Sequence, residues 1–187
     1  MKIIISIVCA VFCLVPALSS AQEYGSSSKF YLSAFFDRQS LGVIGSSQQL
    51  QPLVVSGVGG YWLRPGIGLE LEAGFGLVGD DVASLELETN NTVALNLRLE
   101  SPPIERFGAY ALIGYVRTSF SADDGTRDST LSFPGGRAAL GLTYSLTQKM
   151  MLDAAFTHHD YDSDTRINSF RFGVRFDIGS KRATWLN

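Results

Sequence analysis

Hydrophobic and polar residues alternate along much of this chain with a period of two. In the longest example, residues 66–77, Ile, Leu, Ala and Phe occupy one face, while Gly and Glu occupy the other. Residues 93–100, 137–145 and 167–178 repeat the alternation. Because residues i and i+2 of a helix point to opposite sides, this pattern predicts β-strands.

Weaker alternation fills the intervals at residues 29–39, 53–63, 107–119 and 150–161. With the strand that ends at Glu100 extended back to about residue 84, the total is eight strands. Both faces of residues 107–119 carry apolar side chains, and we place Gly108 and Gly114 on the polar face because small residues recur there in the other strands. We expect a single domain.

The predicted connections alternate in length. Residues 64–65, 101–106 and 145–148 form short turns, whereas residues 40–51, 79–83, 122–133 and 160–166 form longer polar segments. Short turns on one side and long loops on the other are typical of outer-membrane β-barrels, in which the short turns face the periplasm. An even strand count then places both ends of the barrel on the periplasmic side.

The direction of the apolar face separates two fold classes. A lipocalin-like barrel or a soluble β-sandwich buries it, whereas a membrane barrel presents it to lipid. Charges of both signs share the polar face with glycines, which suits a narrow, neutralised lumen. Only 18% of the residues are charged, below the roughly 25% of soluble proteins. Turning four arginines toward lipid would cost on the order of 10 kcal/mol. We therefore predict an all-β, eight-stranded antiparallel up-and-down transmembrane barrel with its charges inside.

The inward charges form the best-defined candidate site. We expect a structural ion-pair network in the lumen, with an arginine from Arg98, Arg171 or Arg175 between Glu70 and Glu72. An eight-stranded barrel is just wide enough for side chains to fill it, so a plug is favoured over a narrow pore. The network is predicted to contain Glu70, Glu72, Arg98, Glu100, Arg137, Asp153, Arg171 and Arg175.

Aromatic residues fall mostly near the predicted strand ends, where membrane barrels carry aromatic girdles at the headgroup level. The alternative is the ordinary aromatic core of a soluble β-sandwich. The residues concerned are Phe30, Phe36, Tyr61, Trp62, Phe75, Phe107, Tyr115, Phe120, Tyr144, Phe156, Tyr161 and Phe176.

The first residues have the pattern of a secretory signal peptide. Met1-Lys2 precedes an apolar run, and Ser19 and Ala21 are small residues at the positions that a signal peptidase reads. We expect cleavage after Ala21, a barrel over residues 22–178 and a periplasmic tail over residues 179–187. A lipoprotein signal at Cys13 is the weaker alternative, because Phe12 stands where a small residue is required. Both cysteines lie in the removed segment, so the mature chain has no thiol for a disulfide or a metal.

The signal segment, the eight amphipathic strands and the aromatic last strand, Phe170-Arg171-Phe172-Gly173-Val174-Arg175-Phe176, together resemble the small outer-membrane β-barrel superfamily. That group includes OmpA-like transmembrane domains, OmpX-like proteins and opacity-type proteins. The resemblance implies secretion across the inner membrane and assembly into a Gram-negative-type outer membrane by the barrel-assembly machinery. Family members commonly end on an aromatic residue, whereas this chain continues past Phe176 to Asn187.

We expect a monomer with a structural, anchoring or surface-interaction role, whose loops contact lipopolysaccharide or a surface protein partner. A net charge of −3 gives no reason to expect nucleic acid. We predict no cofactor, no metal and no catalytic residue. The alternatives are a narrow pore and a lipid-modifying enzyme at His158-His159-Asp160, although alternation places His158 toward lipid and His159 toward the lumen. A calcium-like spacing at Asp160, Asp162 and Asp164 lacks the required Gly and the distal Glu.

Overall fold

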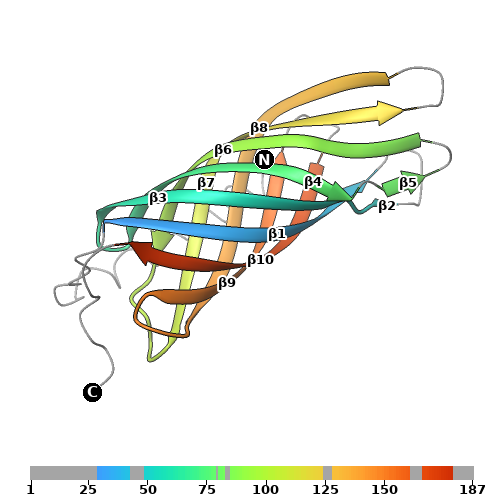
Figure 1. Cartoon of the computed structure of the whole chain (residues 1–187). Coiled ribbons are helices and arrows are strands. Elements are labelled where there is room, and N and C mark those ends of the chain that lie inside the picture. The colour runs from blue at the N-terminus through green and yellow to red at the C-terminus, as the bar shows by residue number, and fades with distance from the viewer. Residues whose placement is uncertain are drawn as a thin grey trace.

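The protein is a closed antiparallel β-barrel (Figure 1). The computed structural model describes residues 29–42, 49–78, 80–82, 85–123, 128–160 and 166–178. Within these ranges, no helix has the length and apolar character needed to cross a membrane. The predicted signal peptide and the predicted tail lie outside the described residues.

Eight long strands form the wall, as the alternation predicts. Each pairs with its neighbours in chain order, and the last pairs with the first over the register Phe30↔Ile178 to Leu41↔Ile167, which closes the barrel. The long strands are β1 (Phe30–Gly42), β3 (Leu53–Arg64), β4 (Ile67–Val78), β6 (Leu85–Glu100), β7 (Phe107–Asp123), β8 (Asp128–Ser145), β9 (Met150–Asp160) and β10 (Arg166–Ile178).

Tight connections gather at one end, which we call the turn end; it also holds the start of β1 and the finish of β10, on the left of Figure 1. The turn between β3 and β4 runs through Pro65 and Gly66. Gly66 has a φ of 75°, and a Cβ there would lie 2.6 Å from the backbone oxygen of Glu100, so this position requires glycine. The opposite end, where the longer connections lie, is called the loop end.

Three neighbouring strands are longer than the rest and project beyond the barrel at the loop end (Figure 1). β6, β7 and β8 have 16, 17 and 18 residues, compared with 11 to 13 in the other long strands. The loop predicted for residues 122–133 is therefore wrong over most of its length, because Asp123 pairs with Asp128 and the ladder continues inward from there. Ser, Thr and Asp made this segment look like a loop, but cross-strand hydrogen bonding outweighs their weak strand propensity.

Two short strands also lie in segments predicted as loops. β2 (Gln49–Leu50) pairs with the end of β1, and β5 (Asp80–Val82) pairs with the start of β6. Both extend the sheet at the loop end. Two- and three-residue strands contain too few positions for an alternating pattern to reveal them.

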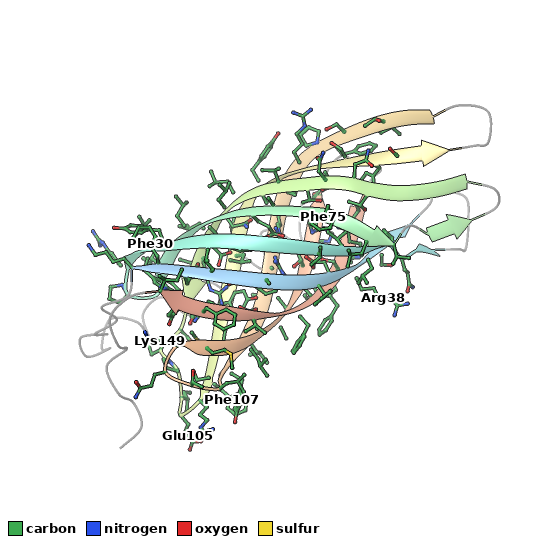
Figure 2. All side chains as sticks on the ribbon, viewed as in Figure 1. Phe30, Arg38, Phe75, Glu105, Phe107 and Lys149 are labelled. Carbon is green, nitrogen blue, oxygen red and sulfur yellow. The ribbon has the colours of Figure 1, made fainter. Side chains whose placement is uncertain are left out.

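Large apolar side chains face outward on every long strand. Leu71 on β4 and Leu142 on β8 are 60% and 61% exposed, and Phe170 on β10 is 59% exposed. Phe30 and Phe107 lie on the outer surface at the turn end, and Phe75 lies closer to the loop end (Figure 2). The polar residues that alternate with them, such as Glu70, Thr143 and Arg171, are buried in the lumen. The outward exposure of large apolar side chains is what a lipid-facing wall requires.

The lumen is less polar than the sequence pattern suggests. Leu112 and Val116 on β7 face inward beside Gly108 and Tyr110, and Leu112 and Tyr110 pack with Ala139 and Ala155. Phe120 was predicted as a girdle residue, but it is 2% exposed and packs its ring against Phe133. That prediction is wrong because β7 is longer than expected, so Phe120 continues the inward row of Val116 and Thr118. Tyr161 lies outside the described residues.

Candidate functional site: the ion-pair network of the lumen

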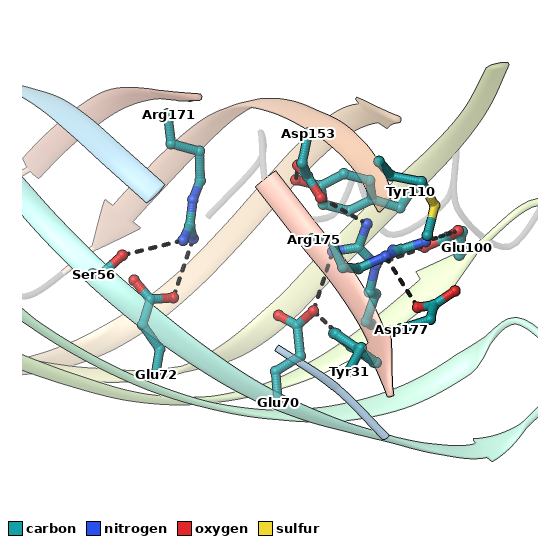
Figure 3. Close-up of polar contacts among 12 residues, drawn as sticks. Tyr31, Ser56, Glu70, Glu72, Glu100, Tyr110, Asp153, Arg171, Arg175 and Asp177 are labelled. Atoms are coloured by element: carbon teal, nitrogen blue, oxygen red, sulfur yellow. Dashed lines mark hydrogen bonds and ion pairs between the residues drawn. The ribbon is translucent and has the colours of Figure 1, made fainter. Parts of the chain in front are cut away.

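The charged side chains predicted to face inward form two groups in the lumen (Figure 3). The group closer to the turn end is called the turn-end cluster, and the other is called the loop-end cluster. The turn-end cluster contains Tyr31, Glu70, Arg98, Glu100, Tyr110, Asp153, Arg175 and Asp177. The loop-end cluster contains Asp37, Ser56, Glu72, Arg137, Ser169 and Arg171. Each of the eight residues named from the sequence lies in one of these groups, and each makes an ion pair.

Arg98 is the centre of the turn-end cluster. Its guanidinium donates from Nε to Glu100 at 2.8 Å, from Nη1 to Glu70 at 3.1 Å and from Nη2 to Asp153 at 3.1 Å. The three carboxylates come from β6, β4 and β9, so one side chain joins strands on different parts of the wall. Arg98 is only 1% exposed, and each of its three nitrogens has a carboxylate partner. A buried arginine needs such saturation, because its desolvation is costly.

Arg175 on β10 closes the turn-end cluster from the other side. Its two terminal nitrogens bind both oxygens of Glu100, at 2.5 and 2.9 Å, in the bidentate arrangement typical of a strong arginine–carboxylate pair. Its Nε lies 3.8 Å from Asp177. Glu100 therefore bridges Arg98 and Arg175, and the turn end of the lumen is filled by connected side chains.

The loop-end cluster is organised around Glu72. One oxygen of this carboxylate accepts from Arg137 at 2.7 Å and from Arg171 at 3.1 Å. Arg171 lies 3.8 Å from Asp37, on the neighbouring strand β1. Glu70 pairs with Arg98, Glu72 pairs with Arg137 and Arg171, and Arg175 forms its ion pairs elsewhere. The prediction of an arginine between Glu70 and Glu72 is therefore wrong, because the two carboxylates take arginines from different strands.

Each of three lumen arginines also lies near an aromatic ring whose position depends on a glycine. Arg98 stacks on Tyr110 with its Cζ 3.5 Å from the ring centroid, and a Cβ at Gly141 would overlap that ring. Arg171 stacks on Phe35 at 3.8 Å, where Gly173 makes room.

Arg175 lies 5.4 Å from the Tyr31 centroid, and Gly60 makes room for that ring. We call each set a glycine–ring–arginine stack. The missing side chain of the glycine lets the ring lie against the barrel wall, and the free face of the ring then receives the arginine, a favourable cation–π arrangement.

Tyr31, Asp37 and Tyr110 belong to the network although the sequence pattern does not predict them there. Tyr31 donates from its hydroxyl to Glu70 at 2.7 Å, and the hydroxyl of Tyr110 donates to Asp153. Alternation within residues 29–39 puts Asp37 on the same face as the other inward residues of that segment. The alternation in this strand is too weak, however, to identify which face points inward from the sequence alone. A tyrosine near a strand end is read as a girdle residue when only the sequence is known.

The two histidines separate as alternation predicts. His159 is 3% exposed in the lumen, whereas His158 is half-buried on the outer wall. His158 Nδ1 lies 2.7 Å from Oδ1 of Asn168 on β10, and Ala138 of β8 lies opposite His158 on its other side. A hydrolytic site needs a serine or similar nucleophile beside the base, whereas the residue that His158 contacts is an asparagine. In the part of the chain that the structure describes, no group of three His, Cys, Asp or Glu side chains has an arrangement suited to a metal ion. The predicted Asp162 and Asp164 lie outside the described residues.

The sequence model of the outer membrane protein β-barrel domain family matches residues 7–177. Among solved structures, Neisserial surface protein A is similar with a TM-score of 0.68 and 15% identity, covering 80% of this chain and 97% of that one. Ail, the attachment invasion locus protein of Yersinia pestis, solved with the heparin analogue sucrose octasulfate, has a TM-score of 0.57 and 12% identity, covering 80% and 99%. The N-terminal β-barrel domain of Pseudomonas aeruginosa OprF has a TM-score of 0.56 and 14% identity, covering 78% and 97%. The comparison with curated proteins found no match. At these identities, the likeness to the solved structures concerns the fold.

Proposed function

Since the chain belongs to the outer membrane protein β-barrel family, we propose that it is a monomeric, non-enzymatic surface protein whose rigid barrel anchors a projecting sheet at the face of a Gram-negative-type outer membrane. The projecting sheet, defined as β5 with the loop-end parts of β6, β7 and β8, contacts lipopolysaccharide or a surface partner. The barrel-assembly machinery inserts the chain after its secretion. The single observation that carries this proposal is the extension of three adjacent strands beyond a barrel whose lumen is filled.

The filled lumen supports an anchoring role. Arg98, Arg171 and Arg175 are each at most 1% exposed, and their partners come from strands distributed around the wall. Removing one member of an interior ion pair strongly destabilises the protein, so these pairs hold the strands in one arrangement. A barrel built in this way presents what it carries at a fixed position.

The length of the projecting sheet supports a contact role. β7 and β8 remain paired from Tyr115↔Gly136 out to Asp123↔Asp128, beyond the first pairing of β8 with β9 at Gly136↔Asp160. This hairpin extension is a regular ladder of strands, so it reaches away from the barrel without the entropy of a long irregular loop. Ladder hydrogen bonds beyond the membrane do not help the chain to cross it, which favours a role outside the bilayer.

A register-matched truncation tests the proposal. Ser121 lies opposite Thr130, so residues 122–129 can be replaced by Asn-Gly, which closes a two-residue hairpin without shifting the ladder. The shortened protein is expected to keep the heat-modifiable gel mobility of a folded barrel and to lose binding of cells to lipopolysaccharide-coated or host-derived surfaces. A matched control replaces residues 161–165, the connection between β9 and β10, by a short Gly-Ser segment. The proposal is wrong if binding survives the hairpin truncation, or if deletion of the gene changes the covalent structure of lipid A.

A further inference from the structure

We propose that the outer wall of the barrel carries a binding site for the phosphate of an outer-leaflet lipid, formed by Arg38, Asn168 and His158. The three residues lie on β1, β10 and β9, which are adjacent in the sheet. The inference rests on the orientation in the proposed function, with the loop end at the cell surface. It concerns the wall of the barrel and not the projecting sheet.

Strand register brings these three side chains into one patch. His158 lies directly opposite Asn168. Arg38 lies opposite Phe170, which is the next outward-facing residue after Asn168 on β10, so Arg38 and Asn168 are diagonal neighbours. Diagonal neighbours of this kind are about 7–8 Å apart between backbones, within reach of a long side chain. Arg38 lies on the outer surface near the loop end of β1 (Figure 2). The patch is therefore at the level where the hydrocarbon face of the wall ends.

The polar groups of the patch are arranged to donate hydrogen bonds. The Arg38 guanidinium makes no ion pair or hydrogen bond with any residue that the structure describes. Nδ1 of His158 donates to Oδ1 of Asn168 at 2.7 Å, which fixes the amide and leaves its NH₂ group to donate elsewhere. A guanidinium fork beside an amide NH₂ matches the oxygens of a phosphate.

Directly below this patch, toward the turn end, the wall is aromatic. Phe36, Phe156 and Phe170 lie on the same three strands and are 56%, 56% and 59% exposed. A cationic group above an exposed apolar surface complements a molecule with a phosphate above acyl chains. A free phosphate ion would gain nothing from these rings, so we assign the site to a phosphorylated lipid, the chemistry of lipopolysaccharide.

An arginine on the opposite side of the barrel provides a contrast. Arg117 lies on β7 in the projecting sheet, where β7 pairs with β8 beyond Gly136, four strands away from β1 in the closed order. Its Nε donates to the hydroxyl of Ser132 on β8 at 2.8 Å. Arg117 therefore has a protein partner, whereas Arg38 has no hydrogen-bond or ion-pair partner among the described residues.

The test measures lipid binding to the full mature chain folded in detergent micelles, with native mass spectrometry as the readout. The probes are bis-phosphorylated lipid A, the same lipid A after phosphatase treatment, and inorganic phosphate. Arg38→Gln is expected to weaken binding of the phosphorylated lipid about tenfold or more, the size of a lost charge-assisted hydrogen bond. Asn168→Ala is expected to weaken it several-fold. Arg106→Gln, at an exposed position in the turn between β6 and β7 at the opposite end of the barrel, is the control with less than a twofold effect.

Four outcomes would overturn the inference: unchanged binding in Arg38→Gln, an equal loss in Arg106→Gln, equal binding of the phosphatase-treated lipid, or competition by inorganic phosphate at the same concentration as the lipid. Arg38 is exposed, so its replacement leaves the barrel fold unperturbed, which heat-modifiable mobility verifies. The hairpin truncation at residues 122–129 leaves Arg38, Asn168 and His158 in place. Lipid binding by that truncated protein therefore separates failure of this site from failure of the proposed surface contact.

Discussion

Replacing Gly141 by alanine is expected to destabilise the barrel, whereas the same replacement at Gly57 is not. Gly141 lies on β8 beneath the ring of Tyr110, and a Cβ at this position would overlap two ring carbons and the hydroxyl oxygen of that side chain. The ring has no free direction in which to move, because its hydroxyl binds Asp153 and its other face carries Arg98. Gly57 lies on the outer wall, where a Cβ would have no heavy atom within 4 Å.

The magnitude follows from these contacts. Forcing an extra methyl group into a packed interior costs about 1–3 kcal/mol. Displacement of the ring also weakens the buried hydrogen bond between Tyr110 and Asp153, and a bond to a charged group contributes roughly 1.5–3 kcal/mol. Replacing glycine by alanine returns about 0.4–1 kcal/mol through the entropy of the unfolded chain. We therefore expect Gly141→Ala to lose about 2–4 kcal/mol and Gly57→Ala to change stability by less than ~1 kcal/mol, in the stabilising direction.

Urea unfolding of the protein from lipid vesicles measures both variants, with tryptophan fluorescence as the signal. A double-mutant cycle with Tyr110→Leu identifies the cause, because the cost of alanine at position 141 is expected to fall when the ring is absent. The reasoning is refuted if Gly141→Ala unfolds within about 0.5 kcal/mol of the wild type. It is equally refuted if the cost of Gly141→Ala is unchanged in the Tyr110→Leu background.

Two further predictions concern the charges and the outer wall. Arg98→Met is expected to lower the free energy of unfolding by about 3–5 kcal/mol, because it leaves Glu70, Glu100 and Asp153 buried without their central partner. Urea unfolding measures this loss, with the exposed Arg117→Gln variant as control, and equal stability of the two variants would contradict the network. Leu95→Arg, at a position that is 52% exposed on the outer wall, is expected to cost about 2–4 kcal/mol in a bilayer, and a barrel in vesicles as stable as the wild type would show that this face does not meet hydrocarbon.

The sequence predicts the wall of the barrel well because one physical constraint governs it. In residues 170–178, each apolar side chain that lipid stabilises is next to a charged side chain that lipid would destabilise, so alternation identifies both faces. The constraint fails outside the membrane, where residues 128–133 form a regular strand although their Asp, Ser and Thr residues are typical of a loop. It also fails along β7, where Leu112 and Phe120 pack inside the lumen among other apolar groups.

The members of the candidate site could be predicted from the sequence, but their pairing could not. Alternation shows that Glu70, Glu72 and Arg98 all face inward. It does not show that Arg98 pairs with Glu70, or that Glu72 pairs with two arginines that lie 65 and 99 residues away in the sequence. Contacts across the lumen depend on the stagger of the strands in the closed barrel. The glycine–ring–arginine stacks are hidden for the same reason, since Gly141 and Tyr110 become neighbours only through the register of β7 with β8.

The orientation of the wall is tested most directly by a nitroxide spin label at Leu71→Cys in a lipid bilayer. The side chain of Leu71 is 60% exposed on the outside, between Gly59 of β3 and Leu95 of β6. We expect the label to collide freely with oxygen dissolved in the hydrocarbon and to be shielded from a polar nickel chelate. A label that the chelate reaches, and that oxygen in the lipid does not, would show that this face meets water and would contradict the membrane barrel described above.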